Sequence, residues 1–279
     1  MSLTVTILGC GSSGGVPRVG QGWGACDPAE PRNRRRRCSI LIERGEGPER
    51  TAVLVDTSPD VREQLIDADV RWLDAVVMTH DHADHTHGLD DLRPLTMVMR
   101  RRIDIYADPV TQQSLLSRFA YCFVQPPGSG YPPILTLKPV AFGSALEIPG
   151  RAGPLHFETF PLTHGDVTVL GLKFNNIAYT PDVSAIPLDS VLRLQGLDVW
   201  IIDALRPSPH PTHFCLSEAL MWIERMRPKR AILTNLHTDL DYGTLVRTLP
   251  AGIEAAYDGM VIHAGPGGGS GLELSARKA

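Results

Sequence analysis

The segment from His80 to His85 holds three histidines and two aspartates within six residues. Imidazole nitrogens and carboxylate oxygens are the ligands that divalent zinc, manganese or iron accept in proteins. Burying several titratable groups together without a partner ion would be costly. The segment therefore predicts a metal centre, and divalent ions held close together can activate water for hydrolysis.

The spacing within this segment indicates two ions rather than one. In an extended stretch, residues two apart point the same way, so His80 and His82 can bind one ion together. If the chain then turns into a helix, Asp84 and His85 face another side and can bind a second ion. His87 falls outside this spacing, and we interpret it as a supporting or surface residue.

The elements that must position these side chains alternate between short strands and helices. A short apolar strand, Ala75–Met78, leads directly into the histidine cluster. A helix is expected to begin at Ser58, an N-cap residue, with Pro59 in the first helical position. Further helices are expected at Val110–Phe119 and Ser217–Arg225. Further strands are expected at Leu3–Leu8, Ser39–Glu43, Ala52–Asp56, Ile103–Ala107, Leu155–Pro161, Val167–Phe174, Asn176–Tyr179, Val199–Asp203 and Ala231–Thr234. This alternation favours one α/β domain over residues 1–279, with a flexible tail from about residue 265.

The histidine cluster also resembles a known family signature. Thr79 to His85, followed by Gly88, is similar to the signature of the metallo-β-lactamase fold hydrolases. That resemblance implies an αββα sandwich, in which two mixed β-sheets are flanked by helices and the metals lie at one end, where the strand-end loops meet. It also implies three further ligands downstream, each beside an expected strand. The matching residues are His164, Asp182 and His237.

The resemblance assigns these ligands to two divalent ions, either zinc or manganese. It implies that the first ion is held by His80, His82 and His164, and the second by Asp84, His85 and His237. Asp182 is expected to bridge the two ions, and both Asp84 and Asp182 are expected to be catalytic. Asp56 matches an early aspartate of the family that orients a ligand through a hydrogen bond.

Two other stretches narrow the resemblance to one branch. Ile7 to Pro17 resembles the start of the phosphoribosyl cyclic phosphodiesterases and of the related tRNA 3′-processing ribonucleases. Pro211 to His213 resembles the stretch that supplies a catalytic histidine in both groups. By that resemblance His213 protonates the leaving alkoxide, a task that suits a histidine with a pKa of roughly 6 to 7. His210 is the competing candidate for this role.

The N-terminal loop departs from the characterised cyclic phosphodiesterase, which has an extra zinc site with clustered cysteines there. Here the corresponding loop has only Cys26, and Asn235 stands where that group has an additional histidine before the last ligand. The extra zinc is therefore expected to be absent. Cys26 and Cys38 could contribute to another structural metal, but the lack of a CxxC pair favours ordinary thiols.

Composition bears on location and partners. The chain of 279 residues has a net charge of −4, which excludes a nucleic-acid binder of the strongly basic kind. We expect a cytoplasmic protein without a membrane partner, because no apolar run is long enough for a signal peptide or a membrane span. The run Arg32–Arg37 is compatible with phosphate or RNA binding and equally with a solvated basic loop. A second copy of the chain, forming a homodimer, is a further candidate partner.

One motif in the first loop points elsewhere. The glycines Gly9, Gly11 and Gly14 follow a strand with the spacing of the dinucleotide-binding fingerprint. That motif requires a helix directly afterwards, and Pro17 and further glycines make a helix implausible here. We therefore expect the glycines to let main-chain N–H groups approach a phosphate or the active site.

These observations support one leading hypothesis and two alternatives. The leading hypothesis is a dinuclear metal-dependent phosphodiesterase that hydrolyses a small cyclic phosphate or a nucleotide-like phosphodiester. The first alternative is a tRNA 3′-processing ribonuclease, although the long insertion that such enzymes use to hold tRNA is not evident. The second alternative is a non-catalytic carrier or binding protein of the same fold. Because all seven expected ligand types are present, catalysis is favoured.

Overall fold

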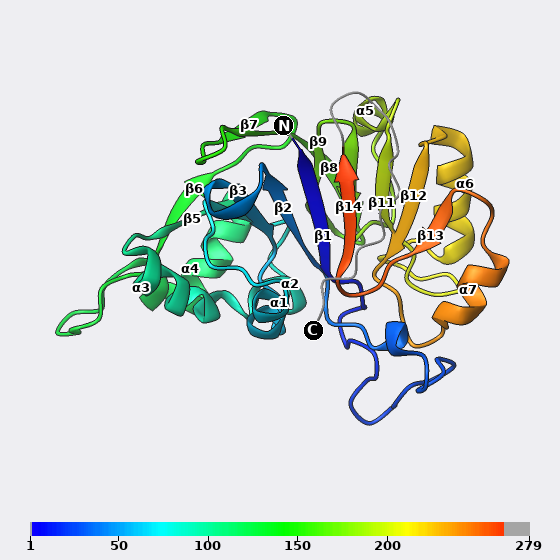
Figure 1. Cartoon of the computed structure of the whole chain (residues 1–279), viewed down its shortest axis with the longest axis horizontal. Helices are drawn as coiled ribbons and strands as arrows, with labels where there is room; N and C mark the ends of the chain where they lie inside the picture. The colour runs from blue at the N-terminus through cyan, green and yellow to red at the C-terminus, as the bar shows by residue number, and fades with distance from the viewer. Residues whose placement is uncertain (1, 265–279) are drawn as a thin grey trace.

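The computed structural model describes residues 2–264, so the tail expected from about residue 265 lies outside the described residues. Two seven-stranded sheets pack face to face, with helices outside each of them (Figure 1). This arrangement confirms the expected αββα sandwich of two mixed sheets.

The first sheet has the strand order β14-β1-β2-β3-β4-β5-β6. Its strands are β1 (Leu3–Gly9), β2 (Ser39–Arg44), β3 (Thr51–Val55), β4 (Ala75–Val77), β5 (Ile103–Ala107), β6 (Leu135–Pro139) and β14 (Met260–Ala264). The pairs from β14 to β3 are antiparallel, and the pairs from β3 to β6 are parallel.

The second sheet has the order β13-β12-β11-β10-β9-β8-β7. Its strands are β7 (Ala145–Ile148), β8 (Leu155–His164), β9 (Val167–Phe174), β10 (Ile177–Thr180), β11 (Val199–Asp203), β12 (Arg230–Thr234) and β13 (Ile253–Ala255). The strands from β7 to β10 are antiparallel, and those from β10 to β13 are parallel. A tight turn joins β9 to β10, with Asn175 in a left-handed conformation at φ 51°.

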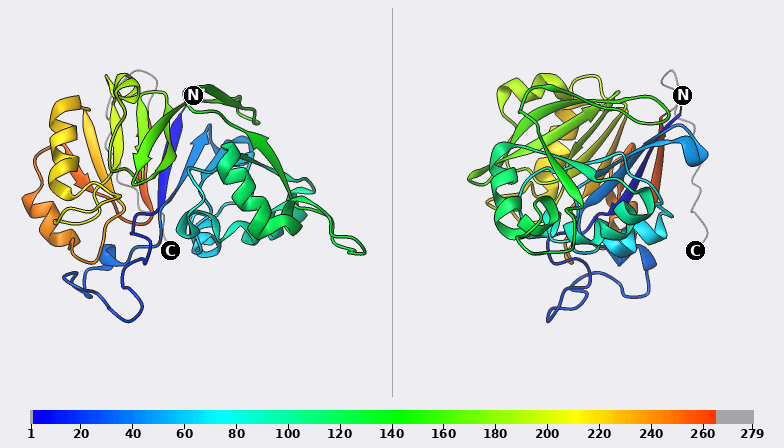
Figure 2. Two further views of the ribbon diagram at one scale, coloured as in Figure 1. Left: turned by 180° about the vertical axis from the view of Figure 1, so that it is seen from behind. Right: turned by 90° about the vertical axis from the view of Figure 1, so that its left-hand side faces the viewer.

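The longer helices lie on the outer faces of the sandwich (Figures 1 and 2). On the side of the first sheet are α1 (Val61–Asp67), α2 (Ala83–Thr86), α3 (Arg93–Met99) and α4 (Pro109–Phe123). On the side of the second sheet are α5 (Leu188–Val191), α6 (Leu216–Met226) and α7 (Tyr242–Thr248). The helix expected from Ser58 begins instead at Val61, because Ser58 accepts a hydrogen bond from the Asp60 N–H in a preceding turn. Among the described residues, no helix combines the length and the apolar character that crossing a bilayer requires.

Apolar side chains on both faces of the central strands hold the layers together. In β3, Val53 and Val55 face the second sheet, while Ala52 and Leu54 face the helices of the first. All four are fully or almost fully buried, which explains why this strand is apolar at consecutive positions rather than at alternate ones. A separate apolar cluster joins the second sheet to α6.

The parallel strands of both sheets end at the same edge of the sandwich, and the long loop between β1 and β2 projects below that edge (Figure 1). Loops at the carboxyl ends of strands are the usual location of binding sites in α/β proteins. The sequence prediction missed β6, β7, β13 and β14, which all lie at or next to the sheet edges.

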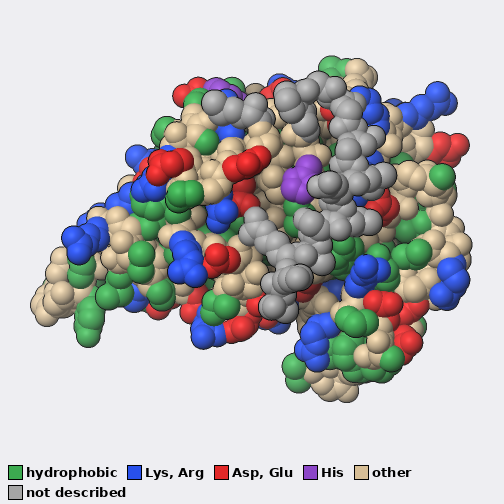
Figure 3. Space-filling view, viewed as in Figure 1, with side chains coloured by type: hydrophobic (Ala, Val, Ile, Leu, Met, Phe, Trp, Pro, Cys, Tyr) green, Lys and Arg blue, Asp and Glu red, His purple; other side chains and the backbone are tan. Residues whose placement is uncertain are grey.

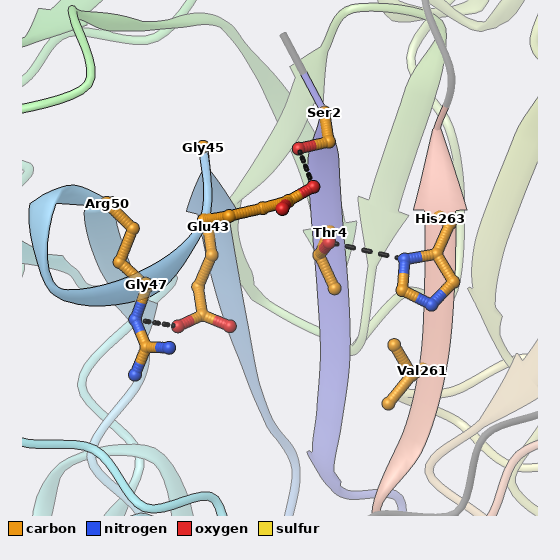
Figure 4. Close-up of a pocket in the computed structure, with 9 residues that line it drawn as sticks. Ser2, Thr4, Glu43, Gly45, Gly47, Arg50, Val261 and His263 are labelled. Carbon is orange, nitrogen blue, oxygen red and sulfur yellow. Dashed lines mark hydrogen bonds and ion pairs between the residues drawn. The ribbon is translucent and has the colours of Figure 1, made fainter.

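A surface pocket lies toward the opposite end of β1 (Figure 4). Its volume is about 280 Å³, and it lies between β1, β2 and β14. Glu43 in this pocket pairs with Arg50 at 2.6 Å, and Thr4 contacts the His263 imidazole at 3.3 Å. The pocket contains none of the residues that the sequence predicted for the chemistry.

Candidate metal centre

The histidine cluster has the extended-then-helical conformation that the spacing predicted. The chain is extended after β4, and His82 is the N-cap of the short helix α2, with φ −60° and ψ 151°. Asp84 and His85 lie in that helix. The pair before the helix and the pair within it therefore leave the chain on different sides.

The first group of candidate ligands has four members, which come from three separate segments of the chain. Its members are His80, His82, His164 and Asp182, and one ligand atom of each lies within 4.8 Å of all the others. The Nε2 atoms of His80 and His164 lie 3.8 and 3.7 Å from Asp182 Oδ2. His164 donates through Nδ1 to the Thr212 carbonyl at 2.6 Å, which leaves its Nε2 free for an ion.

His80 provides a test of whether this group fits a metal ion. Its side chain is buried, and its Nε2 has no hydrogen-bond partner among the described residues. Leaving such an atom unpaired is costly, and a cation at the centre of the group would satisfy it. The residues present therefore fit a divalent ion.

The second group consists of Asp84, His85 and Asp182. His85 Nε2 lies 3.3 Å from Asp182 Oδ1 and 3.6 Å from Asp84 Oδ2. Asp182 thus directs one carboxylate oxygen toward each group, which is the geometry that a bridging ligand requires. Asp182 follows β10, where the sequence placed it.

Asp56 lies behind His85, as the resemblance implied. Its Oδ2 is 2.7 Å from His85 Nδ1, and it accepts hydrogen bonds from the Thr79 N–H (2.7 Å) and hydroxyl (2.8 Å). Asp56 has a φ of 64°, a strained conformation that these contacts hold in place. The carboxylate fixes the His85 ring so that Nε2 faces Asp182.

The two groups differ in the protonation of their imidazoles. Burial and the positive charge of His85 hold the pKa of His80 well below its usual value, and burial also lowers the pKa of His164. Burial disfavours the charged form of His85 too, but Asp182 and Asp56 raise its pKa well above the usual value. Although burial opposes ionisation of Asp182, His85 lowers the pKa of that carboxyl well below its usual range.

His237 is the one expected ligand that neither group in residues 2–264 contains. Its Nε2 lies 2.6 Å from Arg18 Nη1, and its Nδ1 lies 3.0 Å from Asp239. Asn235, at a φ of 61°, occupies the strand end instead and donates through Nδ2 to Asp182 Oδ1 at 3.1 Å. Asn235 follows β12 directly, because this strand ends at Thr234, whereas His237 lies two residues further along the chain. The position of Asn235 next to the strand was therefore a signal in the sequence that this residue, and not His237, would face the centre.

His213 lies against the centre without joining either group. Its Nε2 is 3.9 Å from Asp182 Oδ2, and its ring centroid is 4.5 Å from that of His164. Its Nδ1 is 2.8 Å from Asp203 Oδ2. Burial disfavours protonation, but Asp203 raises the pKa of His213 to about 9. The imidazole therefore carries a proton near neutral pH.

Asp203 is a site residue that sequence reasoning missed, although its position at the end of β11 matches the strand-end pattern of the others. It is fully buried and holds His213 in place. The competing candidate, His210, lies 5.2 Å from His213 between ring centroids and accepts from the Thr212 N–H at 3.3 Å. His213 is thus the histidine that faces Asp182.

In the run Arg32–Arg37, Arg35 is buried and Arg36 and Arg37 are partly buried, whereas Arg32 and Arg34 are exposed. Arg35 is 2% exposed and donates to the Leu240 carbonyl at 2.8 Å. Arg36 and Arg37 form ion pairs with aspartates, and Arg32 and Arg34 lie over aromatic rings. These contacts fix the N-terminal loop to α1 and to the loops after β12 and β13.

The cysteines are free and buried. Cys26 contacts the carbonyls of Thr238 and Leu240, whereas Cys38 contacts the Gly11 carbonyl and the Thr234 hydroxyl. In the part of the chain that the structure describes, no candidate ligand group contains a cysteine. These contacts favour the ordinary-thiol interpretation of both residues.

Comparisons with known proteins agree with this fold. Residues 51–235 match the family model described as a beta-lactamase superfamily domain. The crystal structure of a diphosphatase from the PhnP family is similar over 95% of this chain and 98% of that one, with 36% identity and a TM-score of 0.85.

Two curated proteins are also similar in sequence. An octanoyltransferase of Porphyromonas gingivalis is 32% identical over 259 residues, which are 91% of this chain and 50% of that protein. A ribonuclease Z of a Bradyrhizobium species is 29% identical over 150 residues, which are 52% of this chain and 46% of that protein. The chain therefore spans about half the length of the curated relatives it matches.

Proposed function

This chain belongs to the beta-lactamase superfamily and is a hydrolase of its PhnP-like branch, and we propose that it is a dinuclear metal-dependent phosphodiesterase. Its substrate is a small cyclic phosphate or a nucleotide-like phosphodiester. The observation that carries the proposal is the orientation of Asp182, whose two oxygens face two separate ligand groups. Divalent ions bound there, zinc or manganese, would acidify a water molecule and neutralise phosphoryl oxygens.

The residues around the centre orient the candidate ligands and supply a proton. The Thr212 carbonyl holds His164 and the Asp56 carboxylate holds His85, so the Nε2 atom of each ring faces the ligand groups. His213 carries a proton and presents Nε2 toward Asp182, while Asp203 holds its Nδ1. A protonated imidazole in this position can donate to a departing alkoxide oxygen.

The choice of a phosphate ester rests on two further observations. An alkoxide is a poor leaving group, so a carboxylate-supported general acid beside the centre suits ester cleavage. The names of two relatives, a diphosphatase and a ribonuclease Z, both denote cleavage at phosphate.

A ribonuclease activity is the second candidate, favoured by the similarity to ribonuclease Z. The contacts of Arg35, Arg36 and Arg37 oppose it, because these three side chains are engaged within the protein. On the face shown in Figure 3, basic and acidic side chains are intermixed rather than gathered into a basic surface. We therefore favour a small substrate.

Cytoplasmic location is part of the same proposal. All five cysteines are free and buried, which suits a reducing compartment.

The test is hydrolysis of bis-p-nitrophenyl phosphate by the purified protein with zinc or manganese. We expect metal-dependent release of p-nitrophenol that a chelator abolishes. Absence of turnover with any divalent ion, while a control diesterase is active under the same conditions, would contradict the proposal. Retention of turnover after both groups lose their metal would also contradict it.

A further inference from the structure

One histidine of the candidate centre differs from the others in what holds its ring. Three of the four histidines among the candidate ligands have a polar partner within 3.0 Å of Nδ1, namely His80, His85 and His164. Within residues 2–264, the ring of His82 has no hydrogen-bond partner. A histidine that binds a metal almost always has such a partner on its second nitrogen. The direction of the His82 side chain must therefore be set in another way.

The ring of His82 lies beside other imidazoles. Its centroid is 4.5 Å from that of His80 and 5.0 Å from that of His164. His82 is also less buried than either of them. Because these neighbours form no hydrogen bond with the ring, the main chain is the remaining means of orienting it.

Polar contacts hold the main chain on both sides of His82. The His82 carbonyl accepts hydrogen bonds from the Thr86 hydroxyl at 2.9 Å and from the His85 N–H at 3.1 Å. On the other side, Arg118 donates through Nη1 to the Asp81 carbonyl at 2.5 Å. Because a peptide group is planar, these contacts orient the two peptide groups that flank His82, and with them the bond from its Cα to its Cβ.

Arg118 contacts Asp81 a second time, with Nη2 3.2 Å from Asp81 Oδ2. Side chains alternate in an extended stretch, so Asp81 faces away from the ligand group that His80 and His82 enter. Arg118 belongs to neither candidate ligand group in the described part of the chain. It therefore acts on the centre through the chain that carries His82.

The helix α4 holds Arg118 in this position. Its first half is anchored by Leu115, which is fully buried in the apolar cluster of the first sheet. The helix is kinked at Phe119, where φ is −130° and ψ is 32°. The Phe119 ring then packs edge-on against His87, with 5.4 Å between the ring centroids. Arg118 thus lies at a kink that is anchored on both sides, on the same side of the first sheet as α2 (Figure 1).

On the basis of the metal-dependent function proposed above, we propose that Arg118 is a positioning residue that orients His82 toward the first ion through the Asp81 main chain. The carbonyl contact carries this role. The ion pair joins side chains that are 40% and 29% exposed, and such pairs stabilise little. The effect of Arg118 is therefore on metal binding rather than on folding. It is confined to the first group, because Asp56 holds the His85 ring of the second group independently.

Three substitutions separate the two contacts of Arg118. Arg118→Ala removes both, and Arg118→Lys keeps the charge and one donor. Asp81→Asn keeps the carbonyl and removes the charge of the carboxylate. Arg193→Ala is the matched control, because Arg193 is 38% exposed and lies 3.1 Å from Glu158 in a similar ion pair.

The metal-free proteins are titrated with zinc by calorimetry, and the visible spectrum of bound cobalt reports the ligand geometry. Arg118→Ala should lower the affinity for the first ion by roughly 10- to 100-fold, the usual effect of removing a group that orients a metal ligand. It should also change the cobalt spectrum, while the affinity for the second ion and the Tm stay as in the unchanged protein. Arg118→Lys should recover part of the lost affinity, Asp81→Asn should keep most of it, and Arg193→Ala should keep all of it.

Three results would overturn the proposal. The first is an Arg118→Ala variant that binds the first ion as tightly as the unchanged protein and has the same cobalt spectrum. The second is an equal loss in Asp81→Asn, because the ion pair would then carry the effect. The third is equal weakening of both ions together with a lower Tm, because Arg118 would then only support folding. If Arg118→Ala does not fold, Arg118→Lys carries the test, since it should show the same pattern with a smaller loss.

Turnover of bis-p-nitrophenyl phosphate separates failure of this proposal from failure of the proposed function. At saturating zinc, Arg118→Ala should regain most of the kcat of the unchanged protein, since the substitution acts on metal affinity. If the unchanged protein does not hydrolyse this substrate, the proposed function fails, but the zinc and cobalt measurements still test the role of Arg118. If it does hydrolyse it and Arg118→Ala binds zinc equally well, only the positioning proposal fails.

Discussion

The two ligand groups of the candidate centre share Asp182 but offer an ion different atoms. The first group adds three imidazoles, those of His80, His82 and His164. The second group adds one imidazole, His85, and the carboxylate of Asp84. One position is therefore rich in nitrogen and the other in oxygen, although they lie side by side.

The proton content of the two positions differs as well. Burial lowers the pKa of His80 and of His164, so their nitrogens are available to an ion near neutral pH. His85 retains a proton, because Asp182 and Asp56 raise its pKa against the effect of burial. Since an ion must displace that proton, the second position binds at a greater cost.

If two ions bind here as proposed, the first position should hold its ion tightly and the second should exchange its ion more readily. Imidazole-rich sites favour zinc, whereas carboxylate-rich sites suit manganese or magnesium. Asn235 adds to the difference, because its amide N–H group, rather than an imidazole, faces Asp182 Oδ1. We expect the first position to retain zinc during purification and the second to exchange.

The largest effect should come from Asp182→Asn, which removes the charge that both positions share. Metal content measured by mass spectrometry should fall at both positions, and kcat should fall by about 10³-fold or more, as expected when metal-ion charge stabilisation is lost. Circular dichroism serves as the control for folding. If the variant retained two ions per chain, Asp182 would not be the shared ligand.

A somewhat smaller effect is expected from His213→Ala. This variant tests whether His213 is a metal ligand or a general acid that lies beside the ligands. Metal content should stay unchanged, because His213 belongs to neither group. Turnover of adenosine 2′,3′-cyclic phosphate should fall by about 10²- to 10³-fold, within the range for a general acid. The loss should be smaller for bis-p-nitrophenyl phosphate, whose leaving group needs less protonation. Equal losses for both substrates, or loss of metal, would contradict the assignment; His210→Ala is the matched control.

Local sequence carried much of the information about this centre. The spacing of His80, His82 and His85 predicts extended chain followed by helix, and the structure has that conformation. The strand before the cluster and the core strands were also evident, because burial on both faces leaves a continuous apolar run. Edge strands such as β7 and β13 were missed, since three or four residues with one partner strand leave a weak pattern.

The position of His237 could not be obtained in the same way. A histidine near a strand end satisfied the sequence pattern, but its direction depends on Arg18, which lies more than 200 residues earlier in the chain. The partner of His213 was missed for a similar reason, because Asp203 comes from a different strand end. Long-range contacts of this kind decide which nearby polar residue faces the centre.

Asn235→His should make the two positions more alike. Histidine tolerates the left-handed conformation that Asn235 adopts, and it would offer the second position a nitrogen ligand. We expect affinity for the second ion to rise by roughly 10- to 100-fold, the scale on which residues around metal sites act. Titration of the metal-free protein with zinc measures this, and thermal unfolding reports any packing cost. His237→Asn is the control. If this variant lost the second ion, His237 would be a ligand of that ion, as the family resemblance implied.

The smallest effect should be a difference in pH dependence between the two binding steps. Because the pKa of His85 is raised, metal-free protein carries its proton from pH 6.5 up to that folded-state value, and the second ion must displace it. The affinity of the second position should therefore increase by about tenfold per pH unit in this window and level off above it. The pKa values of His80 and His164 are lowered, so the first position should show no such increase above pH 6.5.

Calorimetry in buffers of different ionisation enthalpy counts the proton released with each ion. Asp56→Asn should shift the window to lower pH, because it removes one of the carboxylates that keep His85 protonated. Equal proton release with both ions would show that the two positions do not differ in this respect.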